Sequence, residues 1–311
     1  MATKAEKERE ARIAARKAEA EKKTKEAKAK SENLKKRLMS KESQAITLVA
    51  RVNMVKNGVI VEVVNTIQAK LAQEAGFTAI CPYDFPQPLT TLGNPVTSDP
   101  RVIRDMINSV LIPVMAKVRV GHIIEAKMAA HLGANIIDES DYITKLASKH
   151  MLNKKEFGVP FMCSVTNLED CFRRIEEGAM MLRNREPGEK YFAHTILAIK
   201  TIFNDLKKLG VDAAAKKLMV DKFENEDTLA MIDKAIADNA LPVPFYGYGS
   251  VCTPTDVAML RKMGCGAIVS NIAFRADNPR RRLKMLVQAS TSYKDAAKMA
   301  ELSIGTNERA P

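Results

Sequence analysis

Short runs of apolar residues alternate with amphipathic stretches from about residue 45 onward. Continuous apolar runs of this length are typical of strands buried on both faces of a parallel sheet, and the stretches between them are typical of covering helices. Helical patterns lie at 66–75, 121–132, 168–177 and 255–263. Eight runs qualify as strands, at 59–64, 78–83, 113–118, 135–140, 160–165, 180–184, 243–248 and 266–271. Eight strand–helix units predict an α/β fold closed into a (β/α)8 TIM barrel.

One connection in this pattern is long. Residues 191–240, between the sixth and seventh strands, are helical in pattern throughout, so they predict an extra helical excursion from the barrel. An open, doubly wound sheet is the alternative, but no Gly-x-Gly-x-x-Gly opens a helix after the first strand. The barrel is therefore the favoured topology.

The first 45 residues differ from the rest in composition. Residues 4–38 are rich in Ala, Lys, Glu and Arg, lack Gly and Pro, and carry Glu and Lys at i,i+4 spacing, which predicts a solvated helix. Of the formal net charge of +12, much lies in residues 1–40, where fourteen Lys and Arg face seven Glu. We expect a basic helical arm at 1–45, which would attract an anionic partner, and the barrel at 46–311.

Composition also bears on location and on metal binding. No apolar run approaches the roughly 18 residues of a membrane span, and the first residues do not resemble a signal peptide. The five cysteines lack C-x-x-C spacing, so neither a disulfide framework nor a zinc site is indicated. We expect a cytoplasmic protein with no membrane segment, no metal site and no bound cofactor.

Polar side chains at the carboxyl ends of the predicted strands are the candidates for chemistry, because the active sites of TIM barrels lie there. Glu62, Lys117 and Asp138 lie near the ends of the first, third and fourth strands, and Arg183 and Arg185 near the end of the sixth. A lysine in an apolar strand is either neutralised by carboxylates in the core or kept as an amine that forms a Schiff base with a carbonyl. The residues by themselves leave both interpretations of Lys117 open.

Several longer motifs together resemble the PdxS/SNZ family, and the resemblance runs from about residue 50 to 305. The motifs are Gly58-Val-Ile-Val-Glu62-Val-Val, Ile112-Pro-Val-Met-Ala-Lys117-Val-Arg119-Val-Gly-His122, Ile137-Asp138-Glu139-Ser140, Val159-Pro-Phe-Met-Cys163, Arg173-Arg174-Ile-Glu-Glu-Gly178-Ala, Met181-Leu-Arg183, Thr253-Pro254 and Asp277-Asn278-Pro279.

The resemblance implies an enzyme that joins ribose 5-phosphate, glyceraldehyde 3-phosphate and ammonia into pyridoxal 5'-phosphate. It implies a dodecamer built from rings, working with a glutaminase subunit. In that family the lysine matching Lys117 forms the Schiff base with the pentose, assisted by an aspartate at the position of Glu62 and by the aspartate matching Asp138. A second lysine, at the end of the sixth strand, receives the intermediate.

The second lysine is replaced in this chain. The family reads Arg-Thr-Lys-Gly-Glu where this chain reads Arg183-Asn184-Arg185-Glu186-Pro187. A guanidinium stays protonated and is not a usable amine nucleophile, so transfer of an imine from one lysine to another is expected to be blocked.

The loops expected to bind phosphate have changed as well. The family's Gly-Ser-Gly-Ile-Phe after the eighth strand is Ser270-Asn271-Ile272-Ala273-Phe274, and Ile272 would obstruct the close approach that glycines allow. The loop after the seventh strand, Ala-Gly-Gly-Val-Ala-Thr-Pro in the family, is Gly247-Tyr248-Gly249-Ser250-Val251-Cys252-Thr253-Pro254, one residue longer and bulkier. The chain ends at Pro311, before the family's tail. The degraded phosphate site would consist of Arg183, Gly188, Gly249, Ser270 and Asn271.

Three functions remain in competition. The leading hypothesis is a divergent, catalytically impaired family member that acts as a structural or regulatory subunit. It would assemble as a homo-oligomer, a hexamer or dodecamer, or as a hetero-oligomer with an active paralogue. The alternative is an active pyridoxal 5'-phosphate synthase with altered residues. A third class is an anchoring protein whose basic arm binds an acidic surface.

Overall fold

The computed structural model describes residues 41–83, 97–140, 151–185 and 191–305. The chain divides into two compact units, Met1–Val49 and Ala50–Pro311, and the fold below is that of the second. The first element described is α2 (Lys41–Val55). The predicted arm at 1–45 lies almost entirely outside the described residues, and Gly188 lies outside them too.

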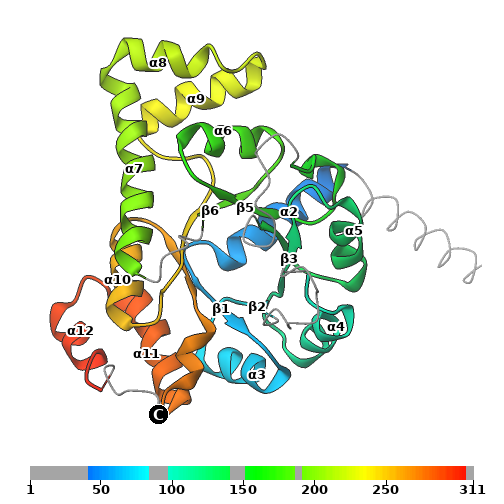
Figure 1. Ribbon diagram of the computed structural model, residues 1–311, viewed down its shortest axis with the longest axis vertical. Coiled ribbons are helices and arrows are strands. Elements are labelled where there is room, and N and C mark those ends of the chain that lie inside the picture. The colour runs from blue at the N-terminus through cyan, green and yellow to red at the C-terminus, as the bar shows by residue number, and fades with distance from the viewer. Residues whose placement is uncertain (1–40, 84–96, 141–150, 186–190, 306–311) are drawn as a thin grey trace, which may run out of the picture. The chain divides into compact units, whose positions relative to one another are not determined.

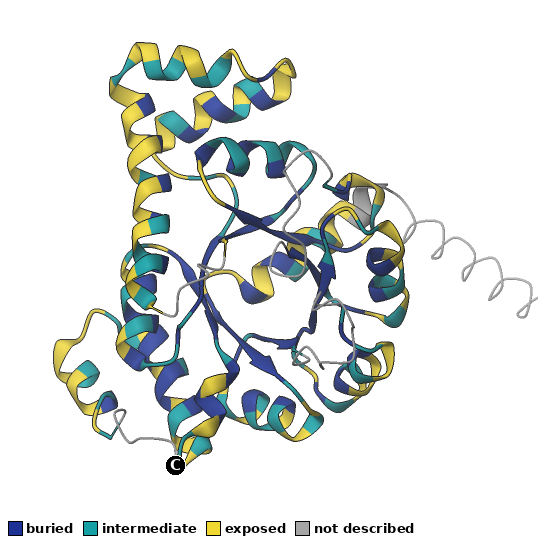
Figure 2. Cartoon of the chain, viewed as in Figure 1, coloured by how far each residue is buried: buried dark blue, intermediate teal, exposed yellow. Residues whose placement is uncertain are grey.

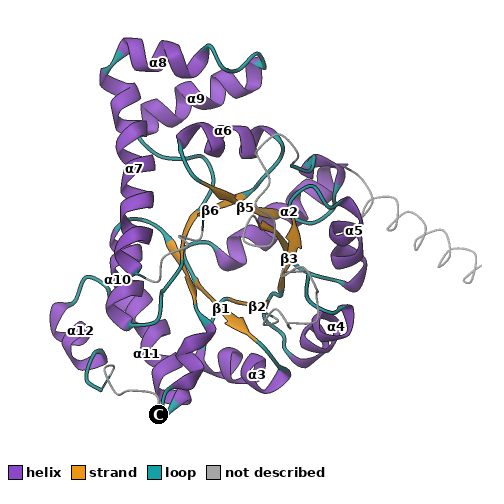
Figure 3. Ribbon diagram, in the orientation of Figure 1, coloured by secondary structure: helices purple, strands orange, loops and turns teal. Residues whose placement is uncertain are grey.

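Within the described ranges, eight parallel strands form the predicted barrel (Figures 1 and 3). Hydrogen-bonded neighbours follow the order β2-β1-β8-β7-β6-β5-β4-β3, and a parallel bridge from Ile80 to Val114 closes the ring. The α/β fold, a (β/α)8 TIM barrel, is confirmed. The strands are β1 (Val59–Val63), β2 (Ala79–Pro82), β3 (Met115–Arg119), β4 (Ile136–Ser140), β5 (Phe161–Val165), β6 (Met181–Asn184), β7 (Phe245–Tyr248) and β8 (Gly266–Val269).

Helices surround the strands (Figure 1). The predicted excursion at 191–240 is confirmed as α7 (Phe192–Val211), α8 (Ala213–Val220) and α9 (Glu226–Asp238), which extend beyond the ring of strands. The other helical segments are α3 (Thr66–Ala75), α4 (Pro100–Ser109), α5 (Ile123–Leu132), α6 (Leu168–Glu176), α10 (Pro254–Lys262), α11 (Pro279–Ser292) and α12 (Ala296–Leu302), with short 3-10 turns η2 (Lys154–Glu156) and η3 (Asn271–Arg275).

The strands are buried (Figure 2), and their side chains form a hydrophobic cluster inside the barrel. Side chains alternate along each strand between the barrel interior and the layer beneath the helices, so the strands are buried on both faces. Val52 and Val55 of α2 join the interior cluster. Its strand residues are Ile60, Ala79, Cys81, Met115, Ile136, Met162, Met181, Tyr246, Tyr248 and Ile268.

Short turns with capping residues join several strands to the helices that follow. Asn65, Asn167 and Thr253 cap the N-termini of α3, α6 and α10 by accepting a hydrogen bond from the backbone three residues on. Gly76 and Gly133 end α3 and α5 at φ of 94° and 96°, which glycine adopts without strain. Because all eight strands are parallel, the polar residues at their carboxyl ends lie together at one end of the barrel.

Candidate active site

Five polar side chains from five strands point into the barrel near its carboxyl end. Glu62 comes from β1, Lys117 from β3, Asp138 from β4, Arg183 from β6 and Tyr248 from β7. None of the five residues is more than 5 % exposed. Because charged groups are costly to bury without partners, each of these side chains needs a compensating neighbour.

Lys117, Glu62 and Tyr248 form a closed triangle of hydrogen bonds. Lys117 Nζ lies 2.5 Å from Glu62 Oε1 and 2.8 Å from Tyr248 Oη. Tyr248 Oη donates in turn to Glu62 Oε1 over 2.7 Å. Lys117 is therefore ion-paired with Glu62 beside the phenol of Tyr248, and a Schiff base at its amine stays a prediction.

A second buried pair lies beside the first. Arg183 Nε is 3.1 Å from both carboxylate oxygens of Asp138, and Arg183 Nη2 donates to Ser140 Oγ over 2.8 Å. The Tyr248 ring is in contact with both cations, because Arg183 Cζ and Lys117 Nζ each lie 4.7 Å from its centroid. The two ion pairs are thus joined through one aromatic ring.

Side chains of β6 and α7 hold the backbone at the end of β7. Asn184 Oδ1 accepts from Tyr248 N over 2.7 Å, and Asn184 Nδ2 donates to Tyr248 O over 2.8 Å. Thr195 Oγ1 lies 3.1 Å from Tyr248 O and 2.9 Å from the carbonyl oxygen of Gly249. The main chain around Tyr248 is therefore fixed by four buried contacts, and Gly249 follows it at a φ of 108°.

The electrostatic surroundings keep Lys117 charged. Burial by itself lowers the pKa of the ammonium, but the neighbouring acidic groups, Glu62 above all, outweigh it and hold that pKa well above 10.5. Burial also raises the pKa of the adjoining Cys81 thiol to about 12. A nucleophilic amine at Lys117 therefore requires transfer of its proton to a neighbouring group.

The residues after β8 that were expected to bind phosphate make contacts within the fold, as Arg183 and Gly249 do. Asn271 Nδ2 donates to the carbonyl oxygen of Glu62 over 3.2 Å and to Gln68 Oε1 over 2.6 Å, which ties η3 to β1. Ser270 Oγ accepts from the backbone of Ile272 over 3.4 Å, and the Ile272 side chain is exposed. Their role as phosphate ligands stays a prediction.

Arg185 lies immediately after β6, two residues beyond Arg183, and is exposed. Its backbone N donates to the carbonyl oxygen of Val165 over 2.8 Å. The structure therefore brings Glu62, Lys117, Asp138 and Arg183 together in the barrel, with Arg185 just outside the end of the strand.

The described residues form neither a metal-binding cluster nor a membrane span. In the ranges that the structure describes, His, Cys, Asp and Glu form no group of three or more that could hold a metal ion. No helix in those ranges is long and apolar enough to cross a membrane. All five cysteines are free.

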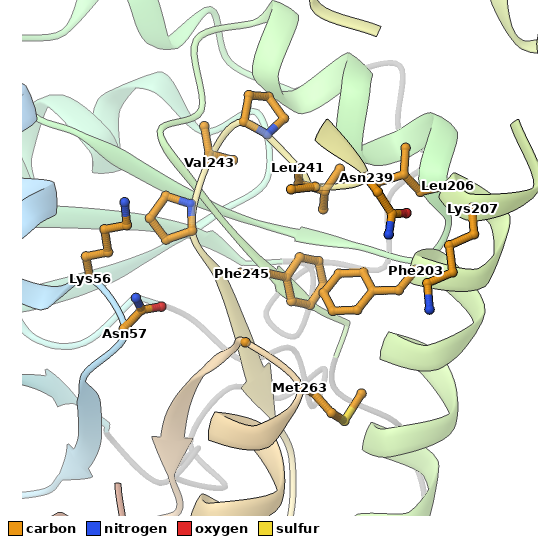
Figure 4. Close-up of a pocket in the computed structure, with 14 residues that line it drawn as sticks. Lys56, Asn57, Phe203, Leu206, Lys207, Asn239, Leu241, Val243, Phe245 and Met263 are labelled. Atoms are coloured by element: carbon orange, nitrogen blue, oxygen red, sulfur yellow. The ribbon is translucent and has the colours of Figure 1, made fainter. Parts of the chain in front are cut away.

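A cavity of about 490 Å³ lies at the opposite end of the barrel (Figure 4). Its lining includes Phe203 of α7 and Phe245 at the start of β7, whose ring centroids are 5.6 Å apart. Lys56 and Met263, which precede β1 and β8, also line it. Because these residues stand before the strands, the cavity is at the amino end and is separate from the polar cluster around Lys117.

Comparison with known proteins identifies the family. The SOR/SNZ family model matches residues 45–247. The chain belongs to the SOR/SNZ family. The pyridoxal 5'-phosphate synthase subunit PdxS of Clostridium botulinum is 38 % identical over 254 residues, which cover 80 % of this chain and 87 % of that protein. PdxS of Corynebacterium glutamicum is 36 % identical over 271 residues, which cover 85 % of this chain and 85 % of that protein. The pyridoxal 5'-phosphate synthase subunit PDX1.3 of Arabidopsis thaliana is 34 % identical over 274 residues, which cover 86 % of this chain and 88 % of that protein.

Membership of the SOR/SNZ family confirms the resemblance that the motifs carry. The relatives are subunits of pyridoxal 5'-phosphate synthase by name. Lys117 and the departure from the family pattern at Arg185 lie inside the matched residues, and Tyr248 directly follows the last of them.

Tyr248 is the residue at the centre of the site that sequence reasoning missed. The sequence pattern places it in a bulky loop, although it also ends the predicted strand at 243–248, and a polar residue at a strand end is the criterion that selects Glu62 and Lys117. Counted back without a gap from Thr253-Pro254, Tyr248 stands at the alanine that opens the family's motif, and Gly247 is the additional residue. A polar aromatic residue at a strand end was the signal that could have identified it.

Proposed function

We propose that this SOR/SNZ-family chain does not complete the synthesis of pyridoxal 5'-phosphate and acts as a structural or regulatory subunit of an oligomeric assembly. The observation that carries the proposal is Arg185, which follows β6 where the family pattern has its second lysine. The reaction implied by the family passes an imine from the first lysine to the second. A guanidinium is always charged in proteins and cannot accept that imine.

An active synthase is the alternative, and the polar cluster gives it support. Lys117 is retained beside the carboxylate of Glu62, with Asp138 opposite it on the neighbouring strand, and the glutamate keeps the charge of the family's aspartate. These residues serve the first imine only. They do not replace the amine that the later steps need, so we favour the impaired subunit.

The test of the proposed function is a synthesis assay. The purified protein is incubated with ribose 5-phosphate, glyceraldehyde 3-phosphate and an ammonium salt, beside PdxS of Clostridium botulinum as a positive control. We expect the absorbance of pyridoxal 5'-phosphate to develop in the control only. Product formation by this chain, at a rate abolished by Lys117→Ala, would overturn the proposal.

The proposed assembly is a homo-oligomer, a hexamer or dodecamer, or a hetero-oligomer with an active paralogue, with a glutaminase subunit as a further partner. The names of the relatives as synthase subunits support it. Exposed apolar side chains support contacts between copies: Leu111 is 93 % exposed and Val211 is 88 % exposed. We propose a cytoplasmic location, which the free cysteines support.

Light scattering at micromolar concentration tests the homo-oligomer, and native mass spectrometry after mixing with an active relative tests the mixed assembly. We expect a mass of six or more chains in at least one of the two experiments. A monomeric mass in both would contradict the proposed assembly.

A further inference from the structure

We propose that Tyr248 occludes Lys117, its ring and hydroxyl occupying the place from which the carbonyl carbon of a pentose phosphate would reach Nζ. The inference rests on the proposed function and deepens it. Arg185 blocks transfer of the imine to a second lysine, and Tyr248 blocks formation of the first imine on Lys117. The inference depends on a different residue from Arg185, so the two can fail separately.

The space around Nζ is the first support. Two of the contacts of the ammonium are Glu62 Oε1 at 2.5 Å and Tyr248 Oη at 2.8 Å. Two aromatic rings flank it, with centroids 4.7 Å away for Tyr248 and 5.2 Å away for Tyr83. Lys117 as a whole is 5 % exposed. A carbonyl group must come to about 3 Å from the attacking atom, and here side-chain atoms already stand near that distance.

The chemistry of imine formation is the second support. The neutral amine attacks the carbonyl carbon of the open-chain sugar phosphate, water leaves and a C=N bond forms, so Nζ must first lose a proton. Glu62 accepts hydrogen bonds from both Lys117 and Tyr248 through one oxygen. The closed triangle keeps the lysine proton in place, and the raised pKa of Lys117 agrees with that.

The fixed position of the ring is the third support. Asn184 and Thr195 hold the backbone of Tyr248 on both sides of the peptide, and Arg183 lies 4.7 Å from the ring centroid. Tyr248 is 3 % exposed. Contacts on its backbone, hydroxyl and face hold the ring beside the lysine, so in this proposal it is a fixed block on Nζ and not a gate.

The replacement of alanine is the fourth support. In the SOR/SNZ pattern quoted above, the position of Tyr248 is alanine, which leaves the volume of a phenol ring open beside the lysine. Truncation of Tyr248 should therefore recreate a place for the substrate that the rest of the cluster still lines.

Borohydride trapping with ribose 5-phosphate, read by intact-mass spectrometry, tests this inference on the full chain. The parent protein and Tyr248→Phe, which keeps the ring, are expected to show no adduct. Tyr248→Ala should gain the mass of one reduced pentose phosphate, mapped to Lys117 by peptide sequencing and lost in Tyr248→Ala/Lys117→Ala. Tyr248→Ser, whose hydroxyl can bond to the buried charges, repeats the test if the alanine variant does not fold.

The outcomes separate the two proposals. An adduct on Lys117 in the parent protein, or in Tyr248→Phe to the same extent as in Tyr248→Ala, would overturn the occlusion by the ring. Folded small-side-chain variants without an adduct would overturn it too, and would leave the proposed function standing. Synthesis of pyridoxal 5'-phosphate by the parent would overturn the proposed function, whatever the trapping shows.

Discussion

The opposite charges of Lys117 and Glu62 neutralise each other inside the barrel. Each charge has lost nearly all of its water, and the attraction between Nζ and Oε1 across 2.5 Å offsets that loss. A buried pair of this kind adds little net stability compared with apolar residues, but removal of one partner leaves an uncompensated charge. The pair is therefore a sensitive place to perturb.

We expect Glu62→Gln to lower the free energy of unfolding by roughly 3 kcal/mol, because the Lys117 ammonium then stays buried without a carboxylate. Urea denaturation followed by circular dichroism measures the change. The matched control is Glu301→Gln, which breaks the exposed pair with Lys298 and should alter stability little. Equal effects of the two substitutions would contradict a compensated buried pair.

The pH dependence of stability follows from the same pair. The pKa of Lys117 is raised above 10.5 in the folded protein, so its stabilising contribution is complete below pH 10.5 and is lost as the pH rises through the folded pKa. We expect the free energy of unfolding of the parent to fall more steeply above pH 10.5 than that of Glu62→Gln. Urea titrations at a series of alkaline pH values measure both slopes, and parallel slopes would refute the expectation.

At the scale of the elements, β6 and β7 are joined first by backbone pairing and then by a side chain. Leu182 pairs with Phe245 and Arg183 with Tyr246. Beyond those pairs Asn184 continues the junction, because its amide both accepts from and donates to the backbone of Tyr248. One side chain thereby satisfies two buried main-chain groups and positions the ring that faces Lys117.

Asn184→Ala should reduce the free energy of unfolding by about 2 kcal/mol, because Tyr248 N and O lose buried hydrogen bonds. It should also permit some trapping of ribose 5-phosphate on Lys117, since the ring is no longer fixed from β6. The control is Asn53→Ala on the exposed surface of α2, which should change neither quantity. If Asn184→Ala and Asn53→Ala have the same stability, the junction does not depend on this amide.

At the scale of the whole molecule, much of the excess of positive charge lies in residues 1–40, which precede the barrel in the sequence. Residues 1–40 contain few large aliphatic side chains, so they cannot bury enough apolar surface to belong to the core. Their charge would attract a polyanionic surface, and such binding weakens as salt rises. The seven glutamates among the basic residues reduce this attraction.

Deletion of residues 2–40 is expected to leave the melting temperature and the oligomer mass of the protein unchanged and to remove salt-sensitive partners. Differential scanning fluorimetry, light scattering and pull-downs from lysate at low and high salt measure the three quantities. An unfolded deletion variant, or the same salt-sensitive partners with and without the arm, would show that the arm has another role.

The hydrophobic pattern alone determined most of the architecture. All eight strands lie within a few residues of the predicted runs, and the excursion at 191–240 is helical as expected. Polar residues at strand ends identified Glu62, Lys117, Asp138 and Arg183, because carboxyl ends of parallel strands meet at one end of a barrel. Local periodicity sufficed because each strand must bury both of its faces.

Tertiary structure decided what those residues do to one another. The eighth strand ends at Val269, before the predicted 271, because Ser270 caps the turn that begins at Asn271. The contacts of the Lys117 ammonium are with Glu62, 55 residues away, and Tyr248, 131 residues away. No local pattern contains such distances along the chain, and only closure of the barrel brings the three side chains together.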